Sequence, residues 1–259
     1  MTEDQQLPPA APAATPAATS SMPIFYKNPQ PLEPGRHPRA GLNPKNNFAF
    51  SQGTNAVALT LSEFPLAARN YPIVFSSASP VVPFAVVGVR DNENLFVEKD
   101  GRWREDAYVP AYVRRYPFIF SEVPNSDRLL LCVDEDAEQF ETDSTQPFFV
   151  NGKPSENLQR ALKFTEMFHA DLEETRRFGA WLEENGMLEE KVARADFSGG
   201  TSYTLRGFRL INPEKLGTLT DAQVLELHKK AWLPLLHFHL QSLQNWQFLS
   251  KLIPQVAAA

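Results

Sequence analysis

The sequence predicts an α+β fold, in which a mixed, mostly antiparallel sheet packs against a long helix and the C-terminal helices, with an added β-hairpin. Three observations predict it. Between residues 48 and 150, short apolar runs are separated by turn residues, a pattern typical of strands. Between residues 155 and 250, apolar residues recur at helical spacing. Alternating segments on either side of Ser198-Gly199-Gly200 indicate the hairpin.

The composition is that of a soluble globular protein. Of the 259 residues, 42% are hydrophobic and 22% are charged, so the chain can bury a sizeable core. Residues 1–22 are rich in Ala and Pro and are predicted to be a disordered tail, because they offer little apolar surface to bury. Residues 23–259 are predicted to form one domain, strand-rich over 48–150 and helix-rich over 155–250.

Six strands are expected in the first half of that domain, and together they would form one sheet: 57–61, 71–75, 84–89, 94–97, 116–120 and 129–133. Ser62 is predicted to cap a short helix that runs to Ala68. Lys99-Asp100-Gly101 is typical of a tight turn between Val97 and Trp103.

The second half carries clear helix signals. After the turn at residues 151–154, Ser155 is suited to cap a helix that ends at Asn185-Gly186 and could bend or break at Gly179. The hairpin over 191–211 is predicted to carry a bulge at Gly207, where its alternation shifts. Thr220 and the glutamine three residues later form a capping box for the next helix, and Pro234 should kink or restart that helix.

The net charge, the lengths of the apolar runs and the N-terminal residues indicate which partners and which cellular location to expect. The 25 basic and 31 acidic residues give a net charge of −6, which argues against a nucleic-acid partner because phosphate contacts need surplus cations. No run of about 18 apolar residues exists, so membrane insertion is not expected. Residues 1–22 lack a basic start and a continuous apolar segment, which favours a cytoplasmic location, with export without a cleaved signal as the alternative.

The residue patterns predict no cofactor, no metal and no catalytic residue. On one helix, His237 and His239 point about 200° apart, and His228 is about 16 Å from His239, so the three cannot share an ion and are expected to be buried or interfacial. The single cysteine, Cys132, lies in an apolar run and is predicted to be a core residue. A glycine-rich phosphate loop and a nucleophile elbow are both absent from the sequence.

One stretch combines guanidinium and aromatic side chains, the composition of recognition surfaces. The predicted ligand-binding residues are Arg102, Trp103, Tyr108, Tyr112, Arg114, Arg115 and Tyr116. We expect these side chains to converge on one solvent-accessible hollow that holds a peptide or an acidic small molecule. The alternative is that the aromatic rings fill the core while the arginines pair with Glu93, Glu105 or Asp106 at the surface.

The sequence resembles the SapC family of bacterial proteins from about Phe25 to Leu249. The matching segments are residues 71–75, 94–96, 101–103, 108–118, 132–136, 151–154 and 240–249, of which Tyr-Val-Pro-Ala-Tyr-Val-Arg-Arg-Tyr-Pro-Phe at 108–118 is the longest. The resemblance implies a link to the bacterial surface layer by name, and a companion role beside a flavin-dependent halogenase. It supplies no catalytic residue.

Three functions follow as alternatives. The first is a non-catalytic accessory or binding protein connected with the cell envelope, which holds a peptide or protein partner. The second is an enzyme whose site is built from dispersed polar residues such as Glu63, Asp91, Asn94, Arg114 and Asp134. The third is a structural component of the surface layer.

Overall fold

The computed structural model describes residues 22–43, 47–122, 126, 128–196 and 202–253. Almost all of the predicted N-terminal tail and the turn of the predicted hairpin at 198–200 lie outside the described residues. Within the described ranges, every strand pairing is antiparallel, and strands and helices both make up a large share of the chain. The predicted α+β class is therefore confirmed.

The strands form two main sheets rather than the single sheet that the sequence predicted. The five-stranded sheet has the order β11-β12-β4-β5-β3, and the three-stranded sheet has the order β1-β7-β6. The bounds in the larger sheet are Leu188–Asp196 for β11, Ser202–Ile211 for β12, Ile73–Ser76 for β4, Pro83–Val86 for β5 and Ala56–Ala58 for β3. Those in the smaller sheet are Pro29–Pro31 for β1, Leu129–Asp134 for β7 and Phe118–Glu122 for β6.

Long-range pairing explains this division. β1, which precedes the region predicted to be strand-rich, pairs with one edge of β7, and β6 pairs with the other. The outer edge of β4 is taken by β12 through Phe208 opposite Ser76, so the hairpin extends the larger sheet. Two short ladders complete the strands: β2 (Gly41–Leu42) with β8 (Phe140–Glu141), and β9 (Phe149–Val150) with β10 (Lys153–Pro154).

Before residue 120, the structure differs from the sequence prediction at one helix cap and at one predicted strand. The cap is Thr60 rather than Ser62: Thr60 and Glu63 form a capping box at the start of the 3₁₀ turn η2 (Leu61–Glu63), which leads into α1 (Phe64–Ala67). Residues 94–97 form no strand, and only Val97 bridges to Trp103 across the predicted tight turn. Another 3₁₀ turn, η1, spans Ala49–Ser51.

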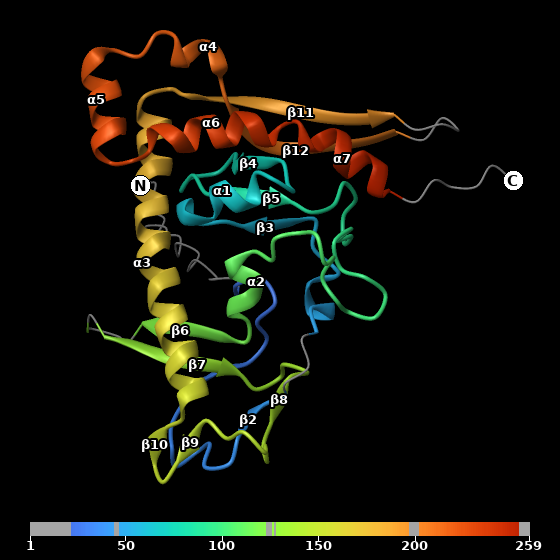
Figure 1. Ribbon diagram of the computed structural model, residues 1–259, viewed down its shortest axis with the longest axis vertical. Helices are drawn as coiled ribbons and strands as arrows, with labels where there is room; N and C mark the ends of the chain where they lie inside the picture. The colour runs from blue at the N-terminus through green and yellow to red at the C-terminus, as the bar shows by residue number, and fades with distance from the viewer. Residues whose placement is uncertain (1–21, 44–46, 123–125, 127, 197–201, 254–259) are drawn as a thin grey trace, which may run out of the picture.

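The long helix α3 (Glu156–Glu184) runs past both sheets (Figure 1) and links them. Ser155 caps it as predicted, since its side chain accepts from the Leu158 N–H. The helix continues through Gly179 without the predicted break. A glycine is needed at this position because the helix packs closely against the backbone of Val81. A Cβ at Gly179 would lie 2.2 Å from the carbonyl oxygen of Val81.

We expect Gly179→Ala to lower the free energy of unfolding by about 1–3 kcal/mol, because the added methyl group overlaps backbone that cannot move cheaply. At an open helical site the same change would stabilise the helix by up to about 1 kcal/mol. Urea unfolding followed by circular dichroism measures the difference. Gly53→Ala is the matched control, since nothing lies within 4 Å of its added Cβ. A gain of stability in Gly179→Ala would contradict the predicted overlap.

The C-terminal third follows the predicted pattern. The register of the hairpin shifts opposite Val192, where Gly207 has a φ of +78°, so the predicted bulge is confirmed. The short helix α4 (Pro213–Leu216) precedes α5 (Asp221–Lys229), which begins with the Thr220 capping box, and α6 (Leu233–Ser242) restarts at Pro234. The last helix is α7 (Asn245–Leu252).

Two hydrophobic clusters lie at the two ends of α3. The larger surrounds the five-stranded sheet and includes Phe64, Phe75 and Phe178, all fully buried. The smaller lies against β6 and β7 and includes Phe118 and Phe148. Cys132 is buried beside it, as predicted. The short helix α2 (Ala111–Arg115), which the sequence analysis did not predict, lies between the two sheets (Figure 1).

Candidate functional site

Two of the seven predicted ligand-binding residues, Arg102 and Trp103, lie apart from the others. Arg102 is exposed and its Nε binds Asp100 at 2.7 Å, an ion pair next to the tight turn. Trp103 is buried, and its indole N–H donates to the Tyr71 hydroxyl at 3.0 Å. Neither residue lines either of the two cavities that flank α2. Both are accounted for by local structure and core packing.

Tyr108 and Arg114 form a hydrogen-bonded chain that ends on a buried carboxylate. Arg114 Nη2 donates to the Tyr108 hydroxyl at 2.8 Å, and that hydroxyl donates to Glu63 Oε1 at 3.1 Å. Arg114 Nε also donates to the carbonyl of Val109 at 3.0 Å. Its guanidinium lies over the Phe164 ring, 5.0 Å from the centroid. The Tyr108 hydroxyl and the Nε and Nη2 atoms of Arg114 are therefore engaged in hydrogen bonds, although Arg114 itself is exposed.

Glu63 fixes the position of α2. Its carboxylate accepts from the backbone N–H of Ala111, the first residue of α2, at 2.6 Å, and from the N–H of Thr60 at 2.7 Å. Burial raises the pKa of this carboxyl, and the hydrogen bonds oppose that rise. The hydrogen bond between Glu63 and Thr60 has a signal in the sequence, because these two residues have the spacing of a capping box. The bond to Ala111 has no such local signal.

Tyr112 and Arg115 line the larger cavity, which has a volume of about 630 Å³. The Arg115 side chain lies among aromatic rings, with Cζ 4.5 Å from the centroid of Phe168, 5.0 Å from that of Tyr112 and 5.6 Å from that of Tyr26. The Tyr112 hydroxyl donates to the carbonyl of Ile24 at 3.1 Å. Helical spacing of three residues places Tyr112 and Arg115 on the same face of α2.

Arg115 is a buried cation without a matching anion. It is 8% exposed, its Nε has no hydrogen-bond partner, and no carboxylate within the described ranges forms an ion pair with it. A buried charge is costly unless it is paired. The rings recover part of this cost through cation–π contacts. A guanidinium in this state favours binding a carboxylate that enters the cavity.

A partly open strand edge borders the same cavity; on this edge the Tyr26 hydroxyl already donates to the carbonyl of Phe118 at 2.6 Å. β6 is the last strand of its sheet, and its outer edge faces α2 (Figure 1). In the ladder between β6 and β7, the N–H of Asp134 donates to the carbonyl of Pro117. Hydrogen-bonded pairs recur at every second residue of an antiparallel ladder, so Ile119 and Ser121 also bond to β7. The N–H and C=O of Phe120 therefore face away from β7, and in the described part of the chain nothing binds them.

The remaining walls of this cavity come from β3, β7 and α3. Apolar side chains cover much of it, including Leu59, Leu129 and Leu172. Polar groups at its border include Ser126, His169 and an ion pair between Arg176 and Glu173. Glu122 also lines this cavity, so its wall combines apolar side chains with groups of both charges, which suits an amphipathic organic ligand.

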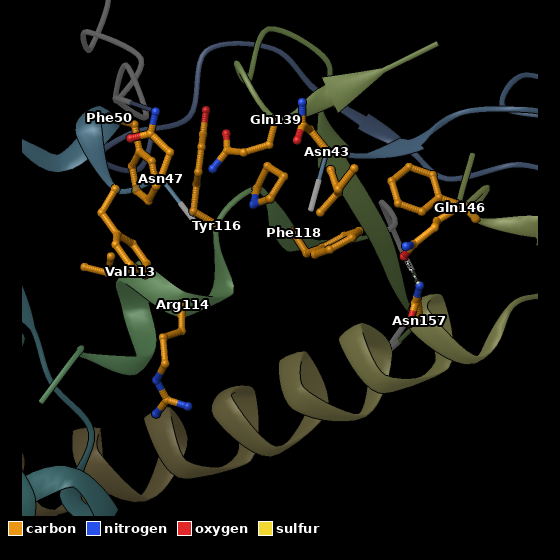
Figure 2. A pocket seen from close by; sticks show the side chains of 14 residues that line it. Asn43, Asn47, Phe50, Val113, Arg114, Tyr116, Phe118, Gln139, Gln146 and Asn157 are labelled. Carbon is orange, nitrogen blue, oxygen red and sulfur yellow. Dashed lines mark hydrogen bonds between the residues drawn. The ribbon is translucent and has the colours of Figure 1, made fainter. Parts of the chain in front are cut away.

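A second cavity, of about 330 Å³, lies on the other side of α2 and contains the last predicted residue, Tyr116, together with Arg114 (Figure 2). The Tyr116 hydroxyl donates to Asp134 Oδ2 at 3.3 Å, and burial raises the pKa of this tyrosine. The sequence analysis missed its amide residues, which are far apart in the chain and form no motif: Asn43, Asn47, Gln139, Gln146 and Asn157.

The structure thus does not bring the seven predicted residues into one hollow. Tyr112 and Arg115 share one cavity, Arg114 and Tyr116 border another, and the other three line neither. The surface alternative holds in part, because Trp103 and Tyr116 are buried, Arg90 pairs with Glu93 and Arg104 pairs with Asp106. It does not hold for Arg102, which pairs with Asp100 and Glu98, or for Arg115, which is buried.

The dispersed polar residues of the enzyme alternative are not gathered either. Arg114 lines the smaller cavity, whereas Glu63, Asp91, Asn94 and Asp134 line neither cavity. Asp134 is fully buried and accepts the backbone N–H groups of Lys27 and Asn28, which holds the N-terminal segment in place.

Among the described residues, no group of three or more His, Cys, Asp or Glu side chains could hold a metal ion. Likewise, no helix in the described ranges is both long and apolar enough to cross a bilayer.

Comparison with known proteins gives one match. The model of the SapC family matches residues 32–249, which is most of the chain. No curated protein and no solved structure matches.

Proposed function

We propose that this chain, which belongs to the SapC family, is a non-catalytic binding protein that holds an extended, carboxylate-bearing peptide segment of a partner against β6. The observation that carries the proposal is Arg115, a buried guanidinium without an ionic partner in the described structure, in a cavity that borders the open part of the β6 edge at Phe120.

The open backbone groups of Phe120 on the edge of β6 support a peptide rather than a small molecule as the ligand, although the carbonyl of Phe118 on this edge is already bound by Tyr26. A peptide that adds a strand to a sheet edge gains main-chain hydrogen bonds, and alternate side chains then enter pockets beside the edge. The unbound N–H and C=O of Phe120 offer such bonds. A peptide strand paired here would run between β6 and α2, beside Tyr112 and Arg115.

Charge complementarity supports a carboxylate in that peptide. A guanidinium binds a carboxylate through two parallel hydrogen bonds, and such charge-assisted bonds are stronger where water is excluded. A glutamate or aspartate of the partner would provide the anion that Arg115 lacks. The flavin-dependent halogenase implied by the family resemblance is one source of such a segment. The proposed setting is the cytoplasm, in connection with the cell envelope.

Binding of paired peptide libraries tests this function. One library of short, amidated, fluorescent peptides carries a central Glu, and its matched library carries Gln at that position. We expect fluorescence anisotropy to show that the best Glu peptides bind the wild-type protein about tenfold more tightly than their Gln counterparts. The Arg115→Met variant keeps a long side chain over Phe168 but no charge, so it should bind both peptides equally weakly.

Arg114→Ala is the control, because its guanidinium is bound to Val109 and Tyr108 and does not line the larger cavity. Hydrogen exchange adds a readout of the binding mode, since the Phe120 amide should become protected when a peptide binds. The proposal is overturned if no Glu peptide binds the wild-type protein, or if Arg115→Met binds the Glu peptides as tightly as wild type.

A further inference from the structure

The smaller cavity differs from the larger one in its chemistry, because its polar lining is neutral. Five amide side chains border it, and the one charged residue in its lining is Arg114. Figure 2 shows the Arg114 side chain directed toward α3, away from the amides, where Tyr108 and Val109 bind its guanidinium. The polar side chains that face the cavity on the amide side are therefore neutral, which favours an uncharged ligand there over a phosphate or a carboxylate.

Four of the amides, other than Asn43, retain unused hydrogen-bonding capacity on two sides of the cavity. Gln139 and Asn47 lie on one side of the Phe118 ring, and Gln146 and Asn157 lie on the other (Figure 2). Asn157 Nδ2 donates to Gln146 Oε1 at 3.0 Å, which leaves the Asn157 oxygen and the Gln146 NH₂ group available. Asn47 Oδ1 accepts from the Ala49 N–H, which leaves its NH₂ group available.

Among these amides, Gln139 gives the strongest indication of a bound ligand. Its Oε1 atom is buried and has no hydrogen-bond partner within the described residues. Buried polar atoms are nearly always paired, and exceptions call for an explanation such as a ligand. The backbone carbonyl of Gln139 accepts from the Asn43 N–H at 2.8 Å, so the segment that carries this side chain is fixed.

Aromatic rings separate the two groups of amides. Phe118, Phe48 and Phe148 contribute to the wall, and Phe50 lies against Tyr116 with ring centroids 4.2 Å apart. The face of an aromatic ring carries partial negative charge, which suits the C–H bonds of a saturated ring. Amides both donate and accept, and so does every hydroxyl group of a sugar.

From these observations we infer that the smaller cavity is a binding site for a neutral carbohydrate. A ligand with hydroxyl groups around its rim would satisfy amides on both sides at once, and its C–H face would lie on the Phe rings between them. The cavity volume of about 330 Å³ is at the lower end of the range for small-molecule sites, about 300–1,000 Å³, so the ligand is a monosaccharide or a short oligosaccharide unit. This site is independent of the peptide proposed above.

Isothermal titration of the full chain against four sets of compounds tests the inference: neutral hexoses, N-acetylhexosamines, hexuronic acids and nucleosides. We expect at least one neutral sugar to bind. The Gln139→Leu variant should weaken that binding about tenfold, with an unchanged or higher Tm, because it removes an oxygen that has no protein partner.

A second variant keeps the test valid if Gln139→Leu folds poorly. Asn157→Ala removes an exposed amide whose side chain bonds only to Gln146 among the described residues, and it should also weaken sugar binding. Gln241→Leu, on the exposed side of α6, is the matched control and should bind like wild type. The inference is overturned if no neutral sugar binds, if hexuronic acids or nucleosides bind better, or if both cavity variants retain wild-type affinity.

Discussion

Replacement of Glu63 by alanine is expected to lower the free energy of unfolding by about 3–5 kcal/mol and to abolish peptide binding. The carboxylate accepts from two backbone N–H groups and two hydroxyl groups, and it is almost completely buried. Its removal leaves the N–H groups of Thr60 and Ala111 without partners, and each buried orphan costs about 1–3 kcal/mol. Urea unfolding followed by tryptophan fluorescence measures the loss.

The functional part of this prediction follows from geometry. Ala111 begins α2, and α2 carries both Tyr112 and Arg115 into the larger cavity. Without the Glu63 carboxylate, nothing else among the described residues binds the Ala111 N–H, so the helix start is released.

Glu63→Gln is the matched control for this prediction. It keeps the side-chain volume and one acceptor oxygen, and we expect a loss of about 1–2 kcal/mol with measurable peptide binding. A Glu63→Ala protein as stable as wild type would show that α2 is held in place by other contacts.

Below pH 6.5, the protein is expected to lose stability through His239. This imidazole is fully buried in α6, and its Nε2 accepts from the N–H of Ile211 at 3.1 Å. Burial lowers its pKa from 6.5 to about 3. Protonation would place a second donor opposite the Ile211 N–H, so the folded protein resists it.

The sign of the effect follows from proton binding. Between pH 6.5 and about 3, the unfolded chain binds a proton at His239 and the folded chain does not. The contribution of this residue is therefore fully present above pH 6.5, and it falls by about 1.4 kcal/mol per pH unit as the pH drops through that window. The total is several kcal/mol, a large share of the stability of an ordinary domain.

The pH dependence of the free energy of unfolding, compared between variants, separates the contribution of His239 from the contributions of other titrating groups. His239→Gln keeps an acceptor for Ile211 and does not titrate, so its free energy of unfolding should fall less steeply than that of wild type between pH 6.5 and 4.5. His228→Gln alters an exposed histidine and should follow the wild-type curve. Parallel curves for His239→Gln and wild type would refute the assignment to His239.

Elements with local causes were predictable from sequence. Ser155 caps α3, Thr220 forms a capping box, and Gly207 marks a bulge, because each signal depends on residues within one or two turns of chain. The buried state of Cys132 and of His239 was also expected from their apolar neighbours. His228 and His237 are exposed in the single chain, so of the three C-terminal histidines, which were expected to be buried or interfacial, only His239 is confirmed as buried.

The division into two sheets was not predictable in the same way. β6 and β7 have the residues of any buried strands, and nothing in their own sequence specifies that β1 rather than β5 is their neighbour. Strand pairing depends on contacts between segments about 100 residues apart, as between Gln30 and Val133.

By itself, the sequence determined the fold class, the family resemblance and the chemical character of the segment over 102–116. Only the tertiary structure decided which of those side chains act together. The helix α2 turns Tyr112 and Arg115 to one face and Arg114 to another, because residues two apart on a helix point about 200° from each other. The amide cavity likewise arises from packing of distant loops, whose side-chain directions are set by contacts that no local pattern records.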